Sequence, residues 1–167
     1  MKSVLYIFSG LPGAGKTVLA KALAEKTRSV YLRIDTVEQA IRDLCAFDVQ
    51  GEGYRLSYRI AEDNLRLGVS VIADSCNPWN LTRSEWQMTA ESANADYENI
   101  EVICSDEIEH RRRVESRISD IQGLILPDWD KVINRKYDAW ETPRISIDTA
   151  GKSVEESISI LFGSLSL

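Results

Sequence analysis

The chain has 167 residues, of which 44% are hydrophobic and 28% charged, and its formal net charge is −6. This composition is typical of one globular domain with a substantial buried core. The negative net charge argues against nonspecific binding to nucleic acid. No apolar run reaches the roughly 18 residues that span a bilayer, and the run at residues 4–8 is too short for a signal peptide, so we expect a cytoplasmic location without a membrane partner.

Apolar runs suited to buried strands recur five times along the chain. They cover residues 4–8, 30–34, 69–73, 100–104 and 145–147. The stretches between them repeat their apolar residues at helical spacing, and the second of these stretches ends at Gly68, where a helix stop is expected. This alternation predicts a parallel five-stranded sheet with helices on both faces, joined by right-handed crossovers.

Three pairs of residues have the spacing of a helix-capping box, and they predict where three of the helices begin. The pairs are Thr82 with Glu85, Asp106 with Glu109, and Ser153 with Glu156. The stretch over residues 106–140 is too long for one helix and contains Gly123 and Pro127, so we expect two helices joined by a mobile segment. Without repeats or long linkers, residues 1–167 are predicted to form one domain.

The most specific motif lies directly after the first apolar run, at residues 10–17. It reads Gly-Leu-Pro-Gly-Ala-Gly-Lys-Thr and matches the phosphate-binding loop: Gly, four residues, Gly, Lys, then Ser or Thr. Its glycines let backbone amides converge on an anion, Lys16 adds a mobile charge, and the Thr17 hydroxyl suits Mg²⁺. The next helix directs its positive end at the same phosphates. The predicted nucleotide-binding residues here are Gly10, Leu11, Pro12, Gly13, Ala14, Gly15, Lys16, Thr17 and Val18.

Two acids stand at strand ends, and ligands of an open α/β sheet lie beyond the carboxyl ends of its strands. Asp35 follows the second run and either accepts a proton from a substrate hydroxyl or caps the next helix, with Glu38 completing a capping box. Asp74 follows the third run and either serves the Mg²⁺ shell or only shapes the turn that Asn77-Pro78 predicts.

Arginines crowd the predicted helix after the fourth strand, at residues 111–113 and 117. Arg113 and Arg117 are four residues apart and would share one helix face. The alternative is a solvated face paired with Glu109 and Glu115, but beside a phosphate loop we expect at least one guanidinium to reach the nucleotide. Arg135 is a further candidate from the far side of the segment.

Weaker signals come from three other places. Thr149, Ala150 and Gly151 follow the fifth run, where they either hold the nucleotide base through backbone groups or form an ordinary turn. His110 has no Ser or Cys nucleophile arrangement around it, and we expect it to be a bystander. The tryptophans either shape an acceptor pocket or belong to the core; they are Trp79, Trp86, Trp129 and Trp140.

Five segments resemble the small phosphate-loop kinases of the nucleoside-monophosphate-kinase-like group. That group includes shikimate, gluconate and adenylyl-sulfate kinases, chloramphenicol phosphotransferase and the 5′-hydroxyl polynucleotide kinase domain. The chain looks most similar to bacterial kinase-like ATPases of the zeta-toxin and polynucleotide-kinase type. The matching segments are residues 10–17, 34–42, 73–78, 105–117 and 147–153. The first is highly specific, and the others gain weight from their order.

The resemblance implies a P-loop NTPase three-layer α/β sandwich with strand order 2-3-1-4-5 and a helical lid over approximately residues 106–140. It places one lid arginine near adenine and one near the phosphates, at Arg113 and Arg117, and makes Asp35 the acid that activates the acceptor hydroxyl. Polynucleotide kinases commonly carry Arg three residues after this acid, where this chain has Glu38. Arg42, two helical turns from Asp35, either substitutes for that missing arginine or does not. The resemblance leaves the identity of the phosphate acceptor open.

The sequence therefore predicts an ATP-dependent, Mg²⁺-dependent phosphotransferase acting on a small hydroxyl-bearing compound. The predicted catalytic residues are Lys16, Asp35, Arg113 and Arg117, and the predicted metal ligands are Thr17 and Asp74. Two alternatives stay open: a regulatory nucleotide-binding ATPase without an acceptor, and a nucleic-acid 5′-hydroxyl kinase, against which the acidic balance and Glu38 count. The sequence leaves open the oligomeric state and the choice between ATP and GTP.

Overall fold

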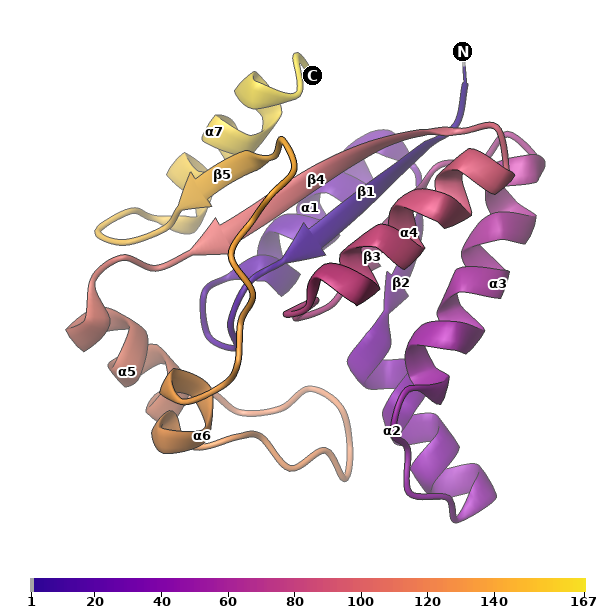
Figure 1. Cartoon of the computed structure of the whole chain (residues 1–167). Coiled ribbons are helices and arrows are strands. Elements are labelled where there is room, and N and C mark those ends of the chain that lie inside the picture. The colour runs from indigo at the N-terminus through magenta and orange to yellow at the C-terminus, as the bar shows by residue number, and fades with distance from the viewer. Residues whose placement is uncertain (1) are drawn as a thin grey trace.

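The computed structural model describes residues 2–167 and contains one sheet of five parallel strands (Figure 1). The strand order is β2-β3-β1-β4-β5, as predicted, so the strand that leads into the glycine-rich loop lies at the centre. The strands are β1 (Val4–Ser9), β2 (Val30–Arg33), β3 (Val71–Asp74), β4 (Asp96–Ile103) and β5 (Ile145–Asp148).

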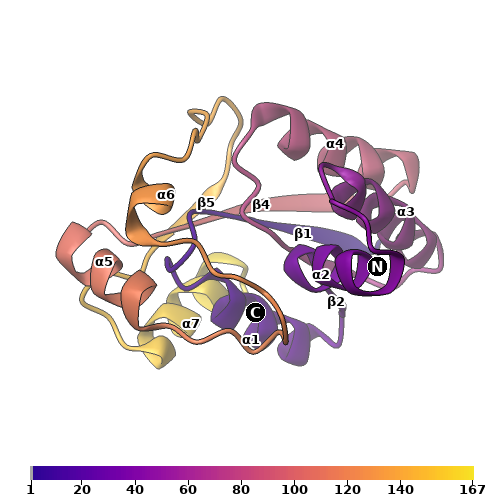
Figure 2. The ribbon, with the colours of Figure 1, turned by 90° about the horizontal axis from the view of Figure 1, so that it is seen from below.

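Helices cover both faces of the sheet, and two more lie beyond its carboxyl edge. Figures 1 and 2 show α1 and α7 on one face, α3 and α4 on the other, and α5 and α6 past the ends of β1 and β4. The helices are α1 (Lys16–Thr27), α2 (Ile34–Cys45), α3 (Glu52–Arg66), α4 (Asn80–Ser92), α5 (Glu107–Ser116), α6 (Trp129–Ile133) and α7 (Val154–Ser164). No helix in residues 2–167 is both long and apolar enough to cross a membrane.

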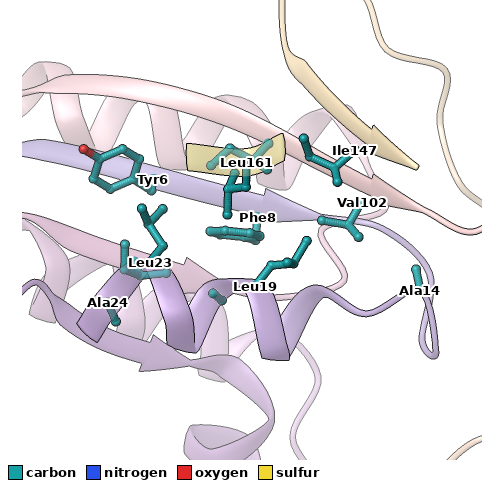
Figure 3. Close-up of a cluster of buried hydrophobic side chains, with 12 residues drawn as sticks. Tyr6, Phe8, Ala14, Leu19, Leu23, Ala24, Val102, Ile147 and Leu161 are labelled. Carbon is teal, nitrogen blue, oxygen red and sulfur yellow. The ribbon is translucent and has the colours of Figure 1, made fainter. Parts of the chain in front are cut away.

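The central strand is buried on both faces, which is why it reads as a continuous apolar run. Its side chains alternate: Tyr6 and Phe8 pack against the α1 and α7 layer, whereas Leu5 and Ile7 pack against the α3 and α4 layer. Figure 3 shows the first of these clusters, with Leu161 of α7 above Phe8. Burial of such side chains stabilises the fold by roughly 1.5–3 kcal/mol each.

The helix starts agree only in part with the capping-box predictions. Ser153 and Glu156 form the complete box at α7, as predicted. At α5, Asp106 accepts a hydrogen bond from the Glu109 amide, but the Glu109 carboxylate turns away toward Arg113. The prediction at Thr82 was wrong, because α4 already begins at Asn80 and the Thr82 hydroxyl donates to the carbonyl of Trp79.

A third apolar cluster joins α5 and α6 to the glycine-rich loop. Val114, Trp129 and Val132 form it, and Leu11 from the loop packs against them. As expected for residues 106–140, two helices are joined by an irregular segment, here residues 117–128. The chain then returns through residues 134–144 to β5, passing the amino-terminal end of α4 (Figure 2).

Candidate active site

The glycine-rich loop turns sharply between β1 and α1 because three of its glycines adopt positive φ angles. The values are +140° at Gly10, +85° at Gly13 and +102° at Gly15. At Gly10 there is also no room for a side chain, since a Cβ would lie 2.1 Å from the carbonyl oxygen of Val102. The loop therefore brings its backbone amides together at the amino-terminal end of α1, where the helix dipole favours an anion.

A cavity of about 530 Å³ opens over this loop, and most of the residues predicted to bind a nucleotide line it. We call it the nucleotide cavity after this prediction. The loop residues that line it are Pro12, Gly13, Gly15, Lys16, Thr17 and Val18. Three predicted residues are turned elsewhere: Gly10 lies against β4, Leu11 packs in the third apolar cluster, and Ala14 belongs to the core. The Lys16 ammonium donates to the Leu11 carbonyl at 3.1 Å, and a phosphate would replace that acceptor.

Asp74 is the last residue of β3 and lines the same cavity as Thr17. Its carboxylate is 3% exposed, and its Oδ2 accepts a hydrogen bond of 2.7 Å from the Tyr31 hydroxyl on β2. Burial and the neighbouring Asp74 raise the pKa of Tyr31, so the phenol stays protonated and donates. A buried carboxylate bonded to a neutral hydroxyl leaves negative charge facing the cavity, which fits an oxygen-liganded cation such as Mg²⁺.

Arg113 connects the loop region to the segment that follows β5. Its guanidinium donates to the Thr149 hydroxyl at 2.7 Å, to the Thr149 carbonyl at 3.0 Å and to Glu109 at 2.6 Å. Arg113 and Thr149 also line a cavity of about 240 Å³ beside Gly15 and Val18. This smaller cavity adjoins the loop where a nucleotide base would extend from the phosphates.

The other two residues predicted to hold the base, Ala150 and Gly151, have backbone amides that are already hydrogen-bonded. The amide of Ala150 donates to Asp148 at 3.0 Å, and the amide of Gly151 donates to Glu109 at 2.8 Å. Both amides are therefore engaged, the first within the turn and the second in tying the turn to α5. Of the predicted trio only Thr149 lines the smaller cavity.

Arg117 lies at the edge of the nucleotide cavity with donors that have no partner within residues 2–167. Its Nε and Nη2 atoms are buried and make no hydrogen bond. Burial lowers the pKa of Arg117 and the carboxylate of Asp35 opposes this effect, which places the two side chains within electrostatic reach. The prediction that Arg113 and Arg117 share a helix face was wrong because α5 ends at Ser116, yet both line one cavity.

Asp35 occupies the first turn of α2, which begins directly at the end of β2. The N-cap of α2 is Arg33 and Asp35 is already the second residue of the helix, so the capping alternative does not describe it. Asp35 lines the nucleotide cavity and also a second cavity of about 520 Å³. Its carboxylate therefore stands where the two spaces meet.

The second cavity has a wall of mixed character. Tyr54, Pro78, Trp79 and Leu81 give it apolar surface, and Trp79 is 48% exposed. Its charged lining residues are Asp35, Glu38, Arg55, Glu85, Arg135 and Lys136. Of the four tryptophans only Trp79 lines this cavity, whereas Trp86 and Trp129 are buried in apolar clusters.

The other arginines singled out as candidates in the sequence divide into those at the site and those on the surface. Arg111 is exposed and pairs with Glu115, as the solvated-face alternative described. Arg42 lines the nucleotide cavity and contacts Glu38 at 3.5 Å. Arg135 lines both cavities, which places it close to the point where they meet.

Sequence reasoning missed two groups of residues at the site. His110, expected to be a bystander, contacts the Pro12 carbonyl through Nε2 at 2.9 Å and packs edge-on against Trp129, so it holds the loop. Asp120 accepts hydrogen bonds from Arg33 at 2.7 Å and Lys21 at 3.0 Å. The polar Arg33 at the end of an otherwise apolar strand was the one local signal of this contact.

Comparisons with known proteins agree with this geometry. A family model described as an AAA domain matches residues 5–121. An adenylyl-sulfate kinase of a Synechococcus species is 25% identical over 171 residues, which cover 98% of this chain and 94% of that protein. An L-seryl-tRNA(Sec) kinase of Methanococcus maripaludis is 25% identical over 168 residues, which cover 89% of this chain but 60% of that longer protein.

Structural similarity extends over nearly the whole chain. The APS kinase of Mycobacterium tuberculosis, solved in complex with AMPPNP and APS, has a TM-score of 0.70, 18% identity and 99% coverage of both chains. That likeness concerns the fold, and it includes the loop, the central strand and the crossovers that position the cavity. Because the AAA domain match spans more than half of the chain, the protein belongs to the AAA domain family, and its fold is that of the P-loop kinases.

Proposed function

We propose that this protein transfers the γ-phosphate of ATP to a hydroxyl group of a small molecule. The observation that carries the proposal is the position of Asp35, which lines both the cavity over the phosphate loop and the second cavity beside it. A donor bound in the first and an acceptor bound in the second would meet at this carboxylate. Catalysis of such a transfer depends mainly on positioning and on electrostatic stabilisation.

The chain supplies a group for each step of this reaction. Asp35 takes the hydroxyl proton while the acceptor oxygen bonds to the γ-phosphorus, and the bond between this phosphorus and the bridging oxygen breaks to release ADP. Lys16 and the loop amides hold the β- and γ-phosphates. Arg117, with its unpartnered donors, and Arg135 at the junction supply positive charge to the equatorial oxygens.

Magnesium would be held at Thr17 and Asp74, which line the nucleotide cavity. Residues 2–167 contain no group of three or more His, Cys, Asp or Glu side chains placed to hold a metal, so phosphate oxygens and water would complete the shell. When bound, the ion neutralises phosphate charge. Tyr31 fixes the orientation of Asp74 through the bond to Oδ2.

The names of the relatives do not settle the acceptor, since adenylyl sulfate and a seryl-tRNA are chemically different. The wall of the second cavity favours a compound with both apolar and polar parts. We therefore test transfer with a panel of small hydroxyl compounds, including sugars, sugar acids, nucleosides and hydroxy amino acids, using γ-labelled ATP and Mg²⁺. Label on one panel member supports the proposal, whereas label released only as inorganic phosphate supports a regulatory ATPase.

The first prediction concerns Asp35. Asp35→Asn should leave the affinity for Mg·ATP within about twofold while lowering the transfer rate on the order of 10²-fold or more, because the proton acceptor is lost. Calorimetry gives the affinity and label transfer gives the rate.

Asp43→Asn is the matched control, because it makes the same change on the same helix and Asp43 lines neither cavity. Lys16→Ala should instead abolish nucleotide binding itself. If Asp35→Asn transfers phosphate at the wild-type rate, Asp35 is not the proton acceptor.

A further inference from the structure

Arg83, on α4, is a buried cation that lies outside both cavities. Its side chain is 2% exposed, and the acceptors around it are amide oxygens rather than carboxylates. Nε donates to the Asn77 carbonyl at 3.1 Å and Nη2 to the Pro78 carbonyl at 3.3 Å. Burying a guanidinium costs free energy unless its donors are hydrogen-bonded, so the arrangement of the acceptors around Arg83 decides whether it can be buried here.

The remaining bonds of Arg83 reach a second segment of the chain. Nη1 donates to the side-chain oxygen of Asn80 at 3.1 Å, to the Asp138 carbonyl at 3.0 Å and to the Ala139 carbonyl at 3.4 Å. Asp138 completes the connection, because its amide donates to Pro78 at 2.8 Å and its carboxylate accepts from the Asn80 amide at 3.0 Å. We call this set of contacts the Arg83 junction.

Two aromatic rings from the same returning segment pack against the guanidinium. The Arg83 Cζ atom lies 4.1 Å from the centre of the Trp140 ring and 4.7 Å from that of Tyr137. Such contacts offset part of the cost of burying the charge. A lysine has three donors and no planar fork, so it cannot reproduce the set of contacts.

The two segments that meet at the Arg83 junction carry different walls of the second cavity. Pro78 and Trp79 line it from the turn after β3, and Arg135 and Lys136 line it from the returning segment. Arg135 also lines the nucleotide cavity. Residues 134–140 contain no strand and only the last turn after α6. Apart from the Arg83 junction, the Tyr137 hydroxyl also ties them to the sheet, by donating to Glu101 of β4 at 3.1 Å.

We propose that Arg83 is a positioning residue that fixes these two walls relative to each other and thereby places Arg135 at the point of transfer. Arg83 touches neither ligand and acts through the segment that it holds. The proposed consequence for catalysis rests on the function proposed above, whereas the structural part does not. The two parts are tested separately.

The structural part is tested by limited tryptic digestion of the full chain, with cleavage sites identified by mass spectrometry. In Arg83→Lys, cleavage after Arg135 and Lys136 should accelerate on the order of tenfold, because these bonds are cut when the segment detaches locally. Arg144→Lys is the matched control, since Arg144 also lies near Trp140, at 5.4 Å, but makes no bond to the turn. Its cleavage at these sites should stay within about twofold of wild type.

The catalytic part is tested by a double-mutant cycle on ATP turnover with Arg83→Lys and Arg135→Gln. If Arg83 acts by placing Arg135, its substitution should cost much less when Arg135 is already absent, whereas a merely structural role gives additive losses. Accelerated cleavage together with additive losses would overturn the link to Arg135. Absence of turnover in the wild type would overturn the proposed function and leave the digestion result to decide the rest.

A second variant guards against a misfolded Arg83→Lys protein, which circular dichroism would reveal. Trp140→Leu removes one stacking face and leaves the hydrogen bonds of the guanidinium in place, so cleavage at the same two sites should rise by a smaller factor. Unchanged cleavage in either folded variant overturns the proposal.

Discussion

Gly10 shows how one residue decides whether the phosphate loop can form. Its φ of +140° is a conformation that side chains disfavour, and the space where a Cβ would lie is filled by the Val102 carbonyl of the neighbouring strand. Neither constraint can relax locally, because β1 pairs with β4 up to Ser9 and Glu101, and Val102 itself is paired with Ile147 of β5. The close approach of the loop to β4 therefore requires glycine.

Gly10→Ala should destabilise the fold by at least about 1–3 kcal/mol from the backbone conformation alone, with the steric clash adding to this. Urea unfolding measures the loss. Gly51→Ala is the control, because Gly51 has a φ of −136° and open space around its Cβ position. Equal free energies of unfolding for the two variants would show that β4 shifts at Val102 to make room for the added methyl group.

At the scale of single residues, the local motif could be predicted and its long-range partners could not. The loop residues and Asp35 could be named as candidates because their chemistry follows from neighbours in sequence, and Asp35 and most of the loop residues line the cavities. Tyr31 and Asp74 are 43 residues apart, and Arg33 and Asp120 are 87 apart, so no local pattern reports those bonds. Arg83 escaped notice for the same reason: its role depends on a segment more than 50 residues further along.

Among the elements, the segment of residues 117–128 is held to the sheet by one acid. Asp120 contacts Arg33 at the end of β2 and Lys21 on α1. These two cations, Arg33 more than Lys21, lower the pKa of Asp120 to about 2. A carboxyl with a depressed pKa contributes stability above its ordinary range, and the contribution is lost as the pH falls toward the depressed value.

The contact should therefore persist at neutral pH and weaken only as the pH falls from about 4 toward 2. Carboxyl NMR titration of Asp120 should give a pKa of about 2 in the wild type and a value nearer 3.8 in Arg33→Gln, because the principal partner is lost. A pKa that does not change in Arg33→Gln would mean that Arg33 does not hold this segment.

Element boundaries were predicted well where one physical signal dominates. Five apolar runs marked the five strands, and the capping box at Ser153 marked the start of α7. The start of β4 was missed, because it begins at Asp96, four residues before the apolar run, and its first three residues are exposed. Prediction failed at Thr82 because the chain after Pro78 enters the helix three residues earlier than the box implies, with Trp79 as the N-cap. The junction of β2 and α2 was also hidden, since no glycine or proline separates them.

For the whole molecule, the loop is fastened to α5 and α6 as well as to the sheet. Leu11 packs in the cluster with Trp129 and Val132, and His110 contacts the carbonyl of Pro12. We therefore expect these two helices to move with the loop rather than over it. Any closure over a bound nucleotide should then come from the irregular segment between them.

Addition of Mg·ATP should stabilise the whole molecule, because it binds the folded chain alone. At a concentration 100 times the dissociation constant the gain is about 2.7 kcal/mol, which corresponds to a rise of roughly 5–10 °C in Tm. Differential scanning calorimetry measures it, with adenosine as the control ligand that lacks phosphates. Lys16→Ala should show no such rise, and a full rise in that variant would contradict the role of the loop.

The direct passage from β2 into α2 has a consequence for how this architecture acquires new acceptors. Asp35 lies two residues beyond a strand of the sheet, with no intervening loop to let its backbone shift. The backbone that carries the proposed proton acceptor is thus fixed by the scaffold, and compounds of different size must adjust to its position. Sequence differences among related proteins should accordingly concentrate in the walls of the second cavity, while the junction of β2 and α2 keeps its position.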